Sequence, residues 1–585
     1  MSAHQDMTGK ATDMQDNSMA HEVFLCDASA AQQRLWLVCG LEGERSNYTI
    51  AGALRLSGPM RPEALQQALD DCLARHETLR TGFVDVDGVP MQAIEPAASL
   101  PLARVDLGAL PREEALRQAM DAAAELARRP FALEKPPLLR AALFRLADDD
   151  WLLALAIHHI VCDGPSLGLL MQDLAHAYAH RQDPAQPALA ELPLQFADFA
   201  EWQQEQLASP ASEALLAAWE ARLAGVPDLQ PPTDFPRPAL REARGARHEA
   251  HLPAAVRDAM AALARELETT PFAVLLAAWG MTLAGWSGQD DFAIGSPVSA
   301  RNDPALAEVV GMFAETSALR FKLEGDPSVD QVLLSMRDVW RDSLAFSGAP
   351  FDRLVQRLRR PQDRSRTPLI QTMFSLNPPA LPLDMAGLQA ETLSLPDGDA
   401  KADLSLEVDE TGDGYALTLD YDGALFRAET IAWLAERYAA LLAQLPAARA
   451  QPLRALLAAA PAQRLASDAE REQLDRFNDT ALALPGAPLL HAQLARQAAQ
   501  TPAAPALWHD GRQMDFAELN HRANRLAHHL RALGVMPDSR VALHFERGFD
   551  QLIALWAVLK AGGAYVPLDP VYPQERLEFM LADSG

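Results

Sequence analysis

The sequence predicts a mixed α/β protein that is divided into several compact units. The chain has 585 residues, 49% of them hydrophobic, and a single hydrophobic core stops growing well below that length, so we expect roughly three or four units. Apolar stretches of strand length and amphipathic stretches of helix length both recur along the chain, which is typical of mixed α/β folds. A Pro-rich stretch at residues 227–238 and an Ala/Pro/Gln-rich stretch at residues 443–465 separate these regions.

The first region mixes strands with helices. Residues 49–56 alternate apolar and polar side chains as a strand does, and residues 62–74 then place apolar side chains at helical spacing. A second helix is predicted at residues 112–128. Two apolar strands are predicted at residues 138–146 and 151–157, on either side of an acidic turn.

The middle and last regions repeat this mixture. We expect the first lobe to end near residue 190, upstream of the Pro-rich stretch. The elements predicted beyond it are helices at 254–267, 272–285, 516–533 and 550–561, strands at 292–297 and 540–543, and a hairpin of 404–408 with 416–421.

The charge and the cysteine content exclude several classes of partner. The chain has 51 Lys and Arg against 79 Asp and Glu, a net charge of −28, which argues against nucleic acid or an anionic membrane. Four cysteines without CxxC spacing fit a reducing compartment and predict neither disulfides nor a metal site. Residues 1–22 lack the apolar core of a signal peptide, and no uncharged apolar run is long enough for a membrane span. We therefore expect a cytoplasmic protein with a flexible N-terminal tail.

The run from His158 to Gly164 is the strongest candidate for chemistry. It follows the predicted strand at residues 151–157, and consecutive side chains of a strand point to opposite faces, so one of His158 and His159 can face a cleft while the other is buried. A histidine with a near-neutral pKa can take a proton from an amine during acyl transfer. We expect Asp163 to hold the loop through an arginine, and Gly164 to allow close backbone approach or a positive φ.

Other interpretations of this run remain open. A second histidine pair, His528-His529, lies in a helical pattern, so a pair alone is a weak signal. A metal site would need a further His or Cys at a ligand spacing. Residues 164–168 fit the G-x-S-x-G pattern of hydrolases, but the strand ends before a loop, and Ser166 suits a helix cap or a solvent-facing position. Cys162 is expected to be a packing residue.

Six further stretches accompany the His-His-x-x-x-Asp-Gly run in a fixed order. They are SAAQQRLW at 29–36, RHETLRTGF at 75–83, FADFAEW at 196–202, VGMF at 310–313, APFD at 349–352 and DRSRTPL at 363–369. With this combination the chain resembles the condensation domains of nonribosomal peptide synthetases.

The resemblance implies a fold and a set of roles. The fold would be two chloramphenicol-acetyltransferase-like lobes in a V-shaped pseudo-dimer, with the donor and the acceptor meeting at His159. His159 would be catalytic, His158 structural, and Asp163 would form a salt bridge with an arginine of the opposite lobe, for which Arg301 is the candidate. The backbone N–H of Gly164 would lie near the developing oxyanion.

One stretch departs from the family pattern. Phe313 is followed by Ala314-Glu315-Thr316, where the family commonly has Val-Asn-Thr, so a carboxylate replaces an amide. This difference affects the details of the donor pocket.

The last residues resemble the beginning of an adenylation domain, in MDFAEL at 514–519 and LKAGGAYVPLDP at 559–570. The Gly-rich phosphate loop of that family should come later, so this fragment is expected to be inactive. The predicted organisation is a tail at 1–22, condensation-domain lobes at 23–190 and 191–450, a linker at 451–485 and a partial adenylation domain at 486–585.

The favoured donor is a free acyl-CoA. Only a short tail precedes the first stretch, so a starter-type condensation that N-acylates an amino acid is favoured over an acyl or peptidyl donor on a separate carrier protein. The acceptor would be an aminoacyl thioester on the phosphopantetheine arm of a downstream carrier domain. No covalently bound cofactor is expected, and the protein is expected to be monomeric. A degenerate module that only binds partner proteins is the alternative, against which the intact His159 and Asp163 argue.

Overall fold

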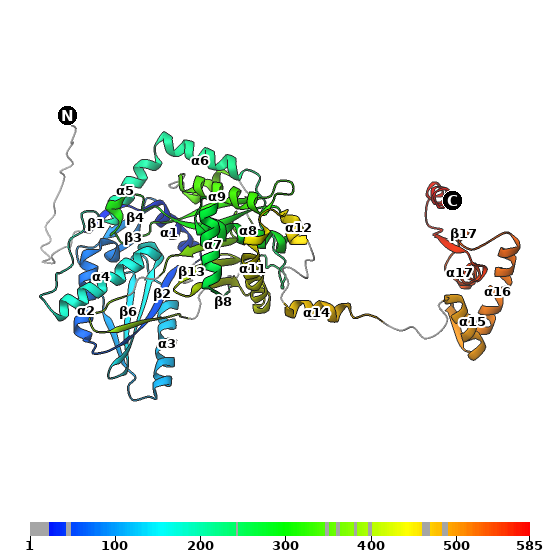
Figure 1. The fold of residues 1–585 in the computed structure, drawn as a ribbon, viewed down its shortest axis with the longest axis horizontal. Helices are drawn as coiled ribbons and strands as arrows, with labels where there is room; N and C mark the ends of the chain where they lie inside the picture. The colour runs from blue at the N-terminus through cyan, green and yellow to red at the C-terminus, as the bar shows by residue number, and fades with distance from the viewer. Residues whose placement is uncertain are drawn as a thin grey trace, which may run out of the picture. The chain divides into compact units, whose positions relative to one another are not determined.

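The computed structural model describes residues 23–42, 48–241, 244–345, 350–358, 363–379, 383–395, 400–458, 468–481 and 489–585. The chain divides into two units, Met1–Asp475 and Arg476–Gly585, and each is described by itself. Figure 1 shows the order of their elements. The tail predicted at residues 1–22 lies outside the described residues.

The first sheet of the first unit holds the strand that leads to the histidine pair. Its five strands lie in the order β12-β2-β7-β6-β5. All pairs are antiparallel except β5 with β6. The strands are β2 (Thr49–Ser57), β5 (Leu102–Asp106), β6 (Leu139–Ala147), β7 (Asp150–His158) and β12 (Gln389–Leu393).

Both faces of this sheet are covered, which explains why β6 and β7 are almost continuously apolar. Leu153 and Leu155 of β7 join a core with helices α2 (Pro62–Arg75) and α4 (Gly164–Gln182). The intervening Leu152 and Ala154 join a second core with helix α3 (Arg112–Arg128). The helices and strands predicted in this region are therefore confirmed.

A smaller three-stranded sheet and two further helices complete the first lobe. The sheet has the order β1-β4-β3. Its strands are β1 (Phe24–Asp27), β3 (Thr81–Val86) and β4 (Val89–Ile94), with helix α1 (Ala30–Glu42) after β1 and the short helix η1 (Glu77–Arg80) before β3. Helix α5 (Phe196–Leu207) buries Phe196 and Phe199 in the core of this lobe, although it lies beyond the boundary expected near residue 190.

The second lobe is built on a six-stranded sheet of order β10-β9-β11-β13-β14-β8. One face packs against four helices in a large core. Helix α8 is apolar on all sides and is buried from Ala273 to Ala284, as expected for an interior helix. The strands are β8 (Gly245–Pro253), β9 (Asp291–Ser299), β10 (Ala314–Lys322), β11 (Thr372–Asn377), β13 (Leu404–Thr411) and β14 (Gly414–Asp422); the helices are α7 (Ala254–Glu266), α8 (Pro271–Ser287), α9 (Val329–Ala345) and α11 (Ala428–Ala448).

The two lobes exchange segments. Strand β12 lies in the chain between β11 and β13 of the second sheet, yet it pairs with β2 at the edge of the first sheet. Residues 306–313, which lead from the second lobe into β10, bury Val310, Met312 and Phe313 in the core of the first lobe. The lobes are therefore joined by packing and by backbone pairing around the loop that carries the histidines.

Two short helices lie in the segment predicted as a linker. Helix α12 (Leu453–Ala458) buries Leu453 and Leu456 in the core of the second lobe. Helix α14 (Asp468–Asn478) follows, while residues 459–467 and 482–488 lie outside the described part of the chain. The linker therefore begins later than residue 451.

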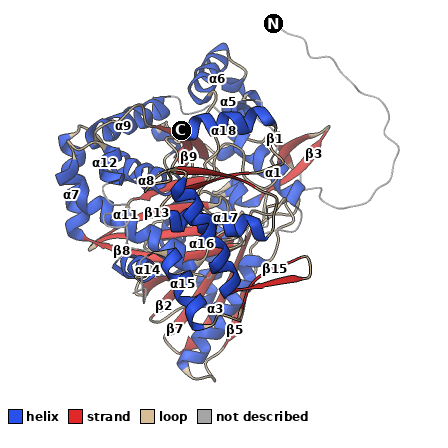
Figure 2. Cartoon of the chain, turned by 90° about the vertical axis from the view of Figure 1, so that its right-hand side faces the viewer, coloured by secondary structure: helices blue, strands red, loops and turns tan. Residues whose placement is uncertain are grey.

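The second unit is a small α/β arrangement with a hairpin of β15 and β16 and a parallel pair of β17 and β18. Its elements are α15 (Leu490–Gln500), β15 (Pro505–His509), β16 (Arg512–Asp515), α16 (Phe516–Ala532), β17 (Arg540–His544), α17 (Phe549–Ala561), β18 (Ala564–Leu568) and α18 (Gln574–Ser584). Figure 2 shows these helices and strands in a second view. The predicted mixed α/β class is confirmed in both units.

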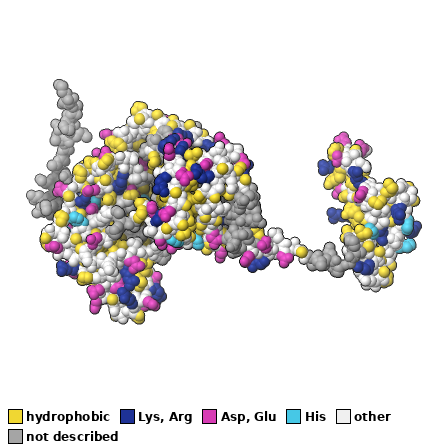
Figure 3. Space-filling view, in the orientation of Figure 1, with side chains coloured by type: hydrophobic (Ala, Val, Ile, Leu, Met, Phe, Trp, Pro, Cys, Tyr) yellow, Lys and Arg dark blue, Asp and Glu magenta, His cyan; other side chains and the backbone are white. Residues whose placement is uncertain are grey.

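The surface charge and the hydropathy of the helices complement the net charge and composition of the chain. Acidic and basic side chains lie intermixed over the face of the first unit that Figure 3 shows. Within the described residues no single helix is long and apolar enough to cross a membrane. Helices α7 and α8 reach that length and apolar composition only when they are counted as one segment, and the two are bent by 105°.

Candidate active site

His158 is the last residue of β7, and its ring is held inside the protein. Its Nδ1 accepts a hydrogen bond from the Ile160 N–H at 3.2 Å, so in the neutral ring Nε2 carries the proton. Nε2 lies 3.7 Å from the Cys39 sulfur, and the ring edge packs on Phe131. Burial lowers the pKa of His158 to about 4. His158 is therefore a neutral side chain with both ring nitrogens directed at protein groups.

His159 opens the short helix η2 (His159–Val161), and the residue is half-buried. Its backbone N–H donates to the Tyr48 carbonyl at 2.7 Å, and its Nδ1 lies 3.1 Å from the sulfur of Met312. Surrounding protein atoms, and next the positive charge of Lys401, lower the pKa of His159 to about 3. The imidazole is thus neutral at pH 7, the state in which it can accept a proton.

The two histidines differ in burial because β7 ends at His158 and His159 begins η2, and not because of alternation along one strand. His158 is buried, whereas His159 is partly exposed. The second pair, His528-His529, is exposed on helix α16, which agrees with its interpretation as an ordinary surface pair.

Asp163 is fully buried and caps helix α4. Its Oδ1 accepts from the Ser166 N–H at 2.8 Å, and its Oδ2 accepts from the Phe313 N–H at 3.1 Å. Its own N–H donates to the Gly311 carbonyl at 3.1 Å. The carboxylate thus joins the start of α4 to the segment that precedes β10.

Arg301 lies next to Asp163, as expected, but it binds other groups more closely. Its Nη2 is 3.6 Å from Asp163 Oδ1 and only 2.5 Å from Ser166 Oγ. Its Nη1 donates to the carbonyls of Leu306, at 2.8 Å, and Val309. The guanidinium therefore neutralises the buried carboxylate while its hydrogen bonds organise residues 306–309.

The expectation that Ser166 caps a helix or faces solvent is wrong. Its side chain is fully buried, donates to the Gly311 carbonyl at 2.8 Å and accepts from the Gly311 N–H at 3.0 Å and from Arg301. The reason is tertiary, because Gly311 comes from a segment 145 residues away. A Cβ at Gly311 would overlap the ring of Phe196, so glycine is required there. This burial also excludes Ser166 as the exposed nucleophile of a hydrolase.

Gly164 does not have the positive φ that the sequence suggested. It is the first residue of α4, where the helical conformation is already in place, and a Cβ added to it would meet no atom within 4 Å. Its N–H has no partner among the described backbone hydrogen bonds and belongs to the first turn of a helix, where free donors gather. Gly164 therefore faces open space rather than a crowded backbone.

Glu315, where the sequence departs from the family pattern, has a hydrogen-bond partner in the first lobe. Gln203 of α5 donates through Nε2 to Glu315 Oε1 at 2.9 Å, and its Oε1 accepts from the Ala30 N–H at 3.0 Å. The carboxylate is thus linked through Gln203 to the start of α1.

Two charged residues that act on His159, Arg34 and Lys401, were missed. Arg34 of α1 forms an ion pair of 3.8 Å with Asp352 of helix α10 (Phe351–Arg357), and both residues of this pair belong to stretches that carry the family resemblance. Lys401 precedes β13; its side chain reaches solvent, although surrounding protein lowers its pKa. No local pattern in the sequence identified Lys401, because its position depends on the packing of the lobes.

Metal and thiol chemistry find no support in the described geometry. Across the described ranges, no group of three or more His, Cys, Asp and Glu lies close enough to hold a metal ion. Cys162 is fully buried, and burial raises the pKa of its thiol. This environment opposes the thiolate form that a nucleophile needs.

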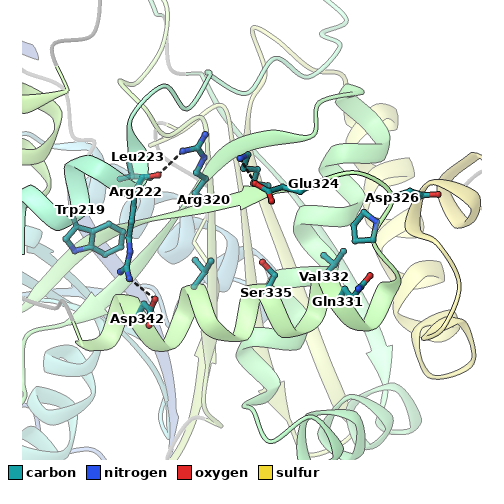
Figure 4. Close-up of a pocket in the computed structure, with 13 residues that line it drawn as sticks. Trp219, Arg222, Leu223, Arg320, Glu324, Asp326, Gln331, Val332, Ser335 and Asp342 are labelled. Carbon is teal, nitrogen blue, oxygen red and sulfur yellow. Dashed lines mark hydrogen bonds and ion pairs between the residues drawn. The ribbon is translucent and has the colours of Figure 1, made fainter.

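A separate pocket lies on the second lobe beside β10 (Figure 4). It has a volume of about 640 Å³ and is formed by α9, β10 and helix α6 (Pro210–Leu223). Two ion pairs lie among its lining residues, Arg222 with Asp342 at 2.8 Å and Lys322 with Glu324 at 2.6 Å. The histidine loop does not line this pocket.

The geometry defines a class of protein with two α/β lobes that meet at a histidine loop. Comparison with known proteins gives the family. The condensation domain model matches residues 25–474, and the AMP-binding enzyme model matches residues 494–585. The chain belongs to the condensation domain family, and a partial AMP-binding segment follows that domain.

The relatives are peptide synthetases. The chain is 40% identical to a linear gramicidin synthase of Brevibacillus parabrevis over 95% of its own length and 7% of that protein. It is 37% identical to phosphinothricin tripeptide synthetase of Streptomyces viridochromogenes, over 95% of the chain and 51% of that protein. The chain thus spans only part of these relatives.

Solved structures show the same architecture. A four-domain nonribosomal peptide synthetase bound to AMP and glycine matches 97% of this chain and 44% of its own, with a TM-score of 0.80 at 23% identity. The X-domain from teicoplanin biosynthesis matches 73% of this chain and 96% of its own, with a TM-score of 0.66 at 27% identity.

Proposed function

We propose that the first unit forms an amide bond between a thioester-activated acyl donor and the amino group of an aminoacyl thioester. The observation that carries this proposal is the half-buried His159 on a loop that both lobes hold, with its Nδ1 3.1 Å from the sulfur of Met312. A neutral imidazole can accept the proton of an attacking amine, and an imidazolium cannot.

The reaction balances with the groups present. The acceptor nitrogen attacks the thioester carbonyl, so a C–N bond forms and the C–S bond breaks. His159 takes the proton from the nitrogen and returns it to the leaving thiolate. The Gly164 N–H, at the positive end of α4, is the donor proposed for the transient oxyanion. His158, Asp163 and Arg301 hold the loop and do not touch the reacting atoms.

The identity of the donor is a second part of the proposal. The relatives named above are peptide synthetases, which favours a donor carried as a thioester on a carrier protein. The acyl-CoA donor of a starter-type reaction remains a prediction from sequence. In either case the acceptor is proposed to arrive on the phosphopantetheine arm of a carrier domain, and the AMP-binding segment takes no part in this step.

The test is a single-turnover assay that follows the acceptor carrier by intact mass. Aminoacyl carrier is mixed with the chain and with either an acyl-carrier or an acyl-CoA donor. We expect a mass gain equal to the acyl group, and its loss in His159→Ala but not in His528→Ala, the matched control on the exposed pair. Equal product from wild type and His159→Ala would refute the catalytic role and favour a module that only binds partners.

A further inference from the structure

The carbonyl groups of the histidine loop are held by side chains from two other segments of the first lobe. Gln32 of α1 donates through Nε2 to the Ile160 carbonyl at 3.2 Å. Thr78 of η1 donates through Oγ1 to the Val161 carbonyl at 3.3 Å. Gln32 and Thr78 are almost completely buried, at 0% and 3% exposure. No other partner of these two carbonyls occurs among the described hydrogen bonds.

The orientation of the Gln32 amide is determined by its other contacts. Its Oε1 accepts from the Ser29 N–H at 2.9 Å, and the Ser29 hydroxyl accepts from the Gln32 N–H at 3.2 Å, which is a capping box at the start of α1. Nε2 must therefore face the loop, where it donates both to Ile160 and, at 3.2 Å, to Gln92 Oε1. Both of its hydrogens are used.

A chain of buried amides extends from this point to the first strand. Gln92 of β4, 1% exposed, donates through Nε2 to the Asp27 carbonyl at 2.7 Å. The path runs from Asp27 through Gln92 and Gln32 to Ile160. Such networks stabilise a single arrangement when every member is satisfied, and they are costly to break.

We propose that Gln32 is a positioning residue for His159, that Thr78 assists it, and that together they aim the imidazole by fixing the two carbonyls that follow it. This inference rests on the proposed amide-forming role of His159. The rest of the turn is held by the His159 N–H on the Tyr48 carbonyl, the Cys162 N–H on the His159 carbonyl and the Ile160 N–H on His158 Nδ1. Gln32 and Thr78 are thus the side chains from other segments of the lobe that hold the carbonyls of the turn.

The sharpest variant is Gln32→Glu, which keeps the shape and the acceptor for Ser29 but removes the donor toward Ile160. At pH 8 the carboxylate faces two oxygens, and we expect the single-turnover rate to fall about 10- to 100-fold, the scale of a small misplacement of a reacting group. The KM for the acceptor carrier should not change.

The pH dependence of the Gln32→Glu variant is the specific readout, because protonation of the new carboxylate restores a hydrogen-bond donor. A buried Glu has a raised pKa, and its protonated form can donate a hydrogen bond to Ile160 again. We therefore expect the rate of Gln32→Glu relative to wild type to rise several-fold between pH 8 and pH 6. The matched control is Gln33→Glu, at a partly exposed neighbour whose Nε2 donates to the Ala28 carbonyl at 3.1 Å, away from the loop. The rate of Gln33→Glu relative to wild type should stay near one at both pH values.

Thr78 gives an independent test. Thr78→Val should slow amide formation, and Thr78→Ser, which restores the hydroxyl, should recover it. Hydrogen exchange of a peptide spanning residues 158–164 should quicken in Gln32→Glu and Thr78→Val but not in Gln33→Glu. Unchanged exchange, or a Gln32→Glu ratio that does not vary with pH, would overturn the positioning role. Because exchange requires no activity, an inert His159 would defeat the proposed function without deciding this inference.

Discussion

Ser166 Oγ receives the Arg301 Nη2 hydrogen bond at 2.5 Å, whereas the Asp163 carboxylate lies 3.6 Å from the same nitrogen. The hydroxyl also bonds both the N–H and the carbonyl of Gly311. One buried side chain therefore joins α4 to the segment before β10, and the charge pair between the lobes acts beside it.

Replacement of Ser166 by alanine should weaken this junction. Ser166→Ala leaves groups of Gly311 and Arg301 without a buried partner, so we expect the free energy of unfolding to fall by about 2–3 kcal/mol. Urea denaturation measures this change. The control is Ser99→Ala, at an exposed serine that donates to Asp70, for which a change within about 0.5 kcal/mol is expected. A similar small value for Ser166→Ala would contradict the junction.

Gly164 and Gly311 should respond in opposite ways to alanine. A Cβ at Gly164 meets open space, so Gly164→Ala should alter the free energy of unfolding by less than about 0.5 kcal/mol. A Cβ at Gly311 overlaps Phe196, so Gly311→Ala should cost about 1–3 kcal/mol or more. If Gly164 faces the reacting groups, its variant should nevertheless slow amide formation. Alanine keeps the backbone N–H, so a fully active Gly164→Ala would contradict the placement of Gly164 against the reacting groups and would leave the hydrogen-bond donor itself unaltered.

The buried His158 should make stability fall as the solution becomes acidic. Its pKa is about 4 in the folded state and 6.5 in a free side chain, so between these values the unfolded chain binds a proton that the folded chain does not. His158 should therefore lower the free energy of unfolding by up to about 1.4 kcal/mol per pH unit from pH 6.5 toward pH 4, and not above pH 6.5, beside a similar contribution from His159. Denaturation of wild type and His158→Gln at pH 7.5 and 5.5 measures the difference, which should be smaller in the variant.

Asp150 should stabilise the first sheet at the turn between β6 and β7. Its carboxylate is 3% exposed and binds Arg55 at 2.9 and 2.8 Å and Arg112 at 3.0 and 2.7 Å. The Arg55 hydrogen bond is the main cause that lowers its pKa, so this stability is present above the ordinary Asp pKa and is lost as pH falls below it. Asp150→Asn should cost about 2–4 kcal/mol in urea denaturation at pH 7.

The matched control for Asp150 is its exposed neighbour. Asp148 is 92% exposed and pairs with Arg145, so Asp148→Asn should change the free energy of unfolding by no more than about 1 kcal/mol. Equal changes in the free energy of unfolding at the two positions would show that burial of the Asp150 ion pairs does not add to stability.

Several elements with a clear period were predictable, whereas others, long helices among them, were not. Helix α3 has the predicted bounds because seventeen residues carry a regular apolar spacing. Strand β12 was missed because its five residues form an edge strand with little buried surface. The place of α5 could not be predicted either, since Phe196 would suit the core of either lobe and only the fold selects one.

The sequence by itself determined many of the elements, the histidine loop and the residues on which the family assignment depends, because these follow from local periodicity and residue identity. Only the tertiary structure decided that Ser166 binds Arg301 and Gly311, that Gly164 faces open space, and that Gln32 holds the turn. The physical reason is separation along the chain. Gln32, Thr78, Gly311, Met312 and Phe313 lie 83 to 153 residues from their partners in and beside the loop, and burial and hydrogen bonds of that range exist only after the chain has folded.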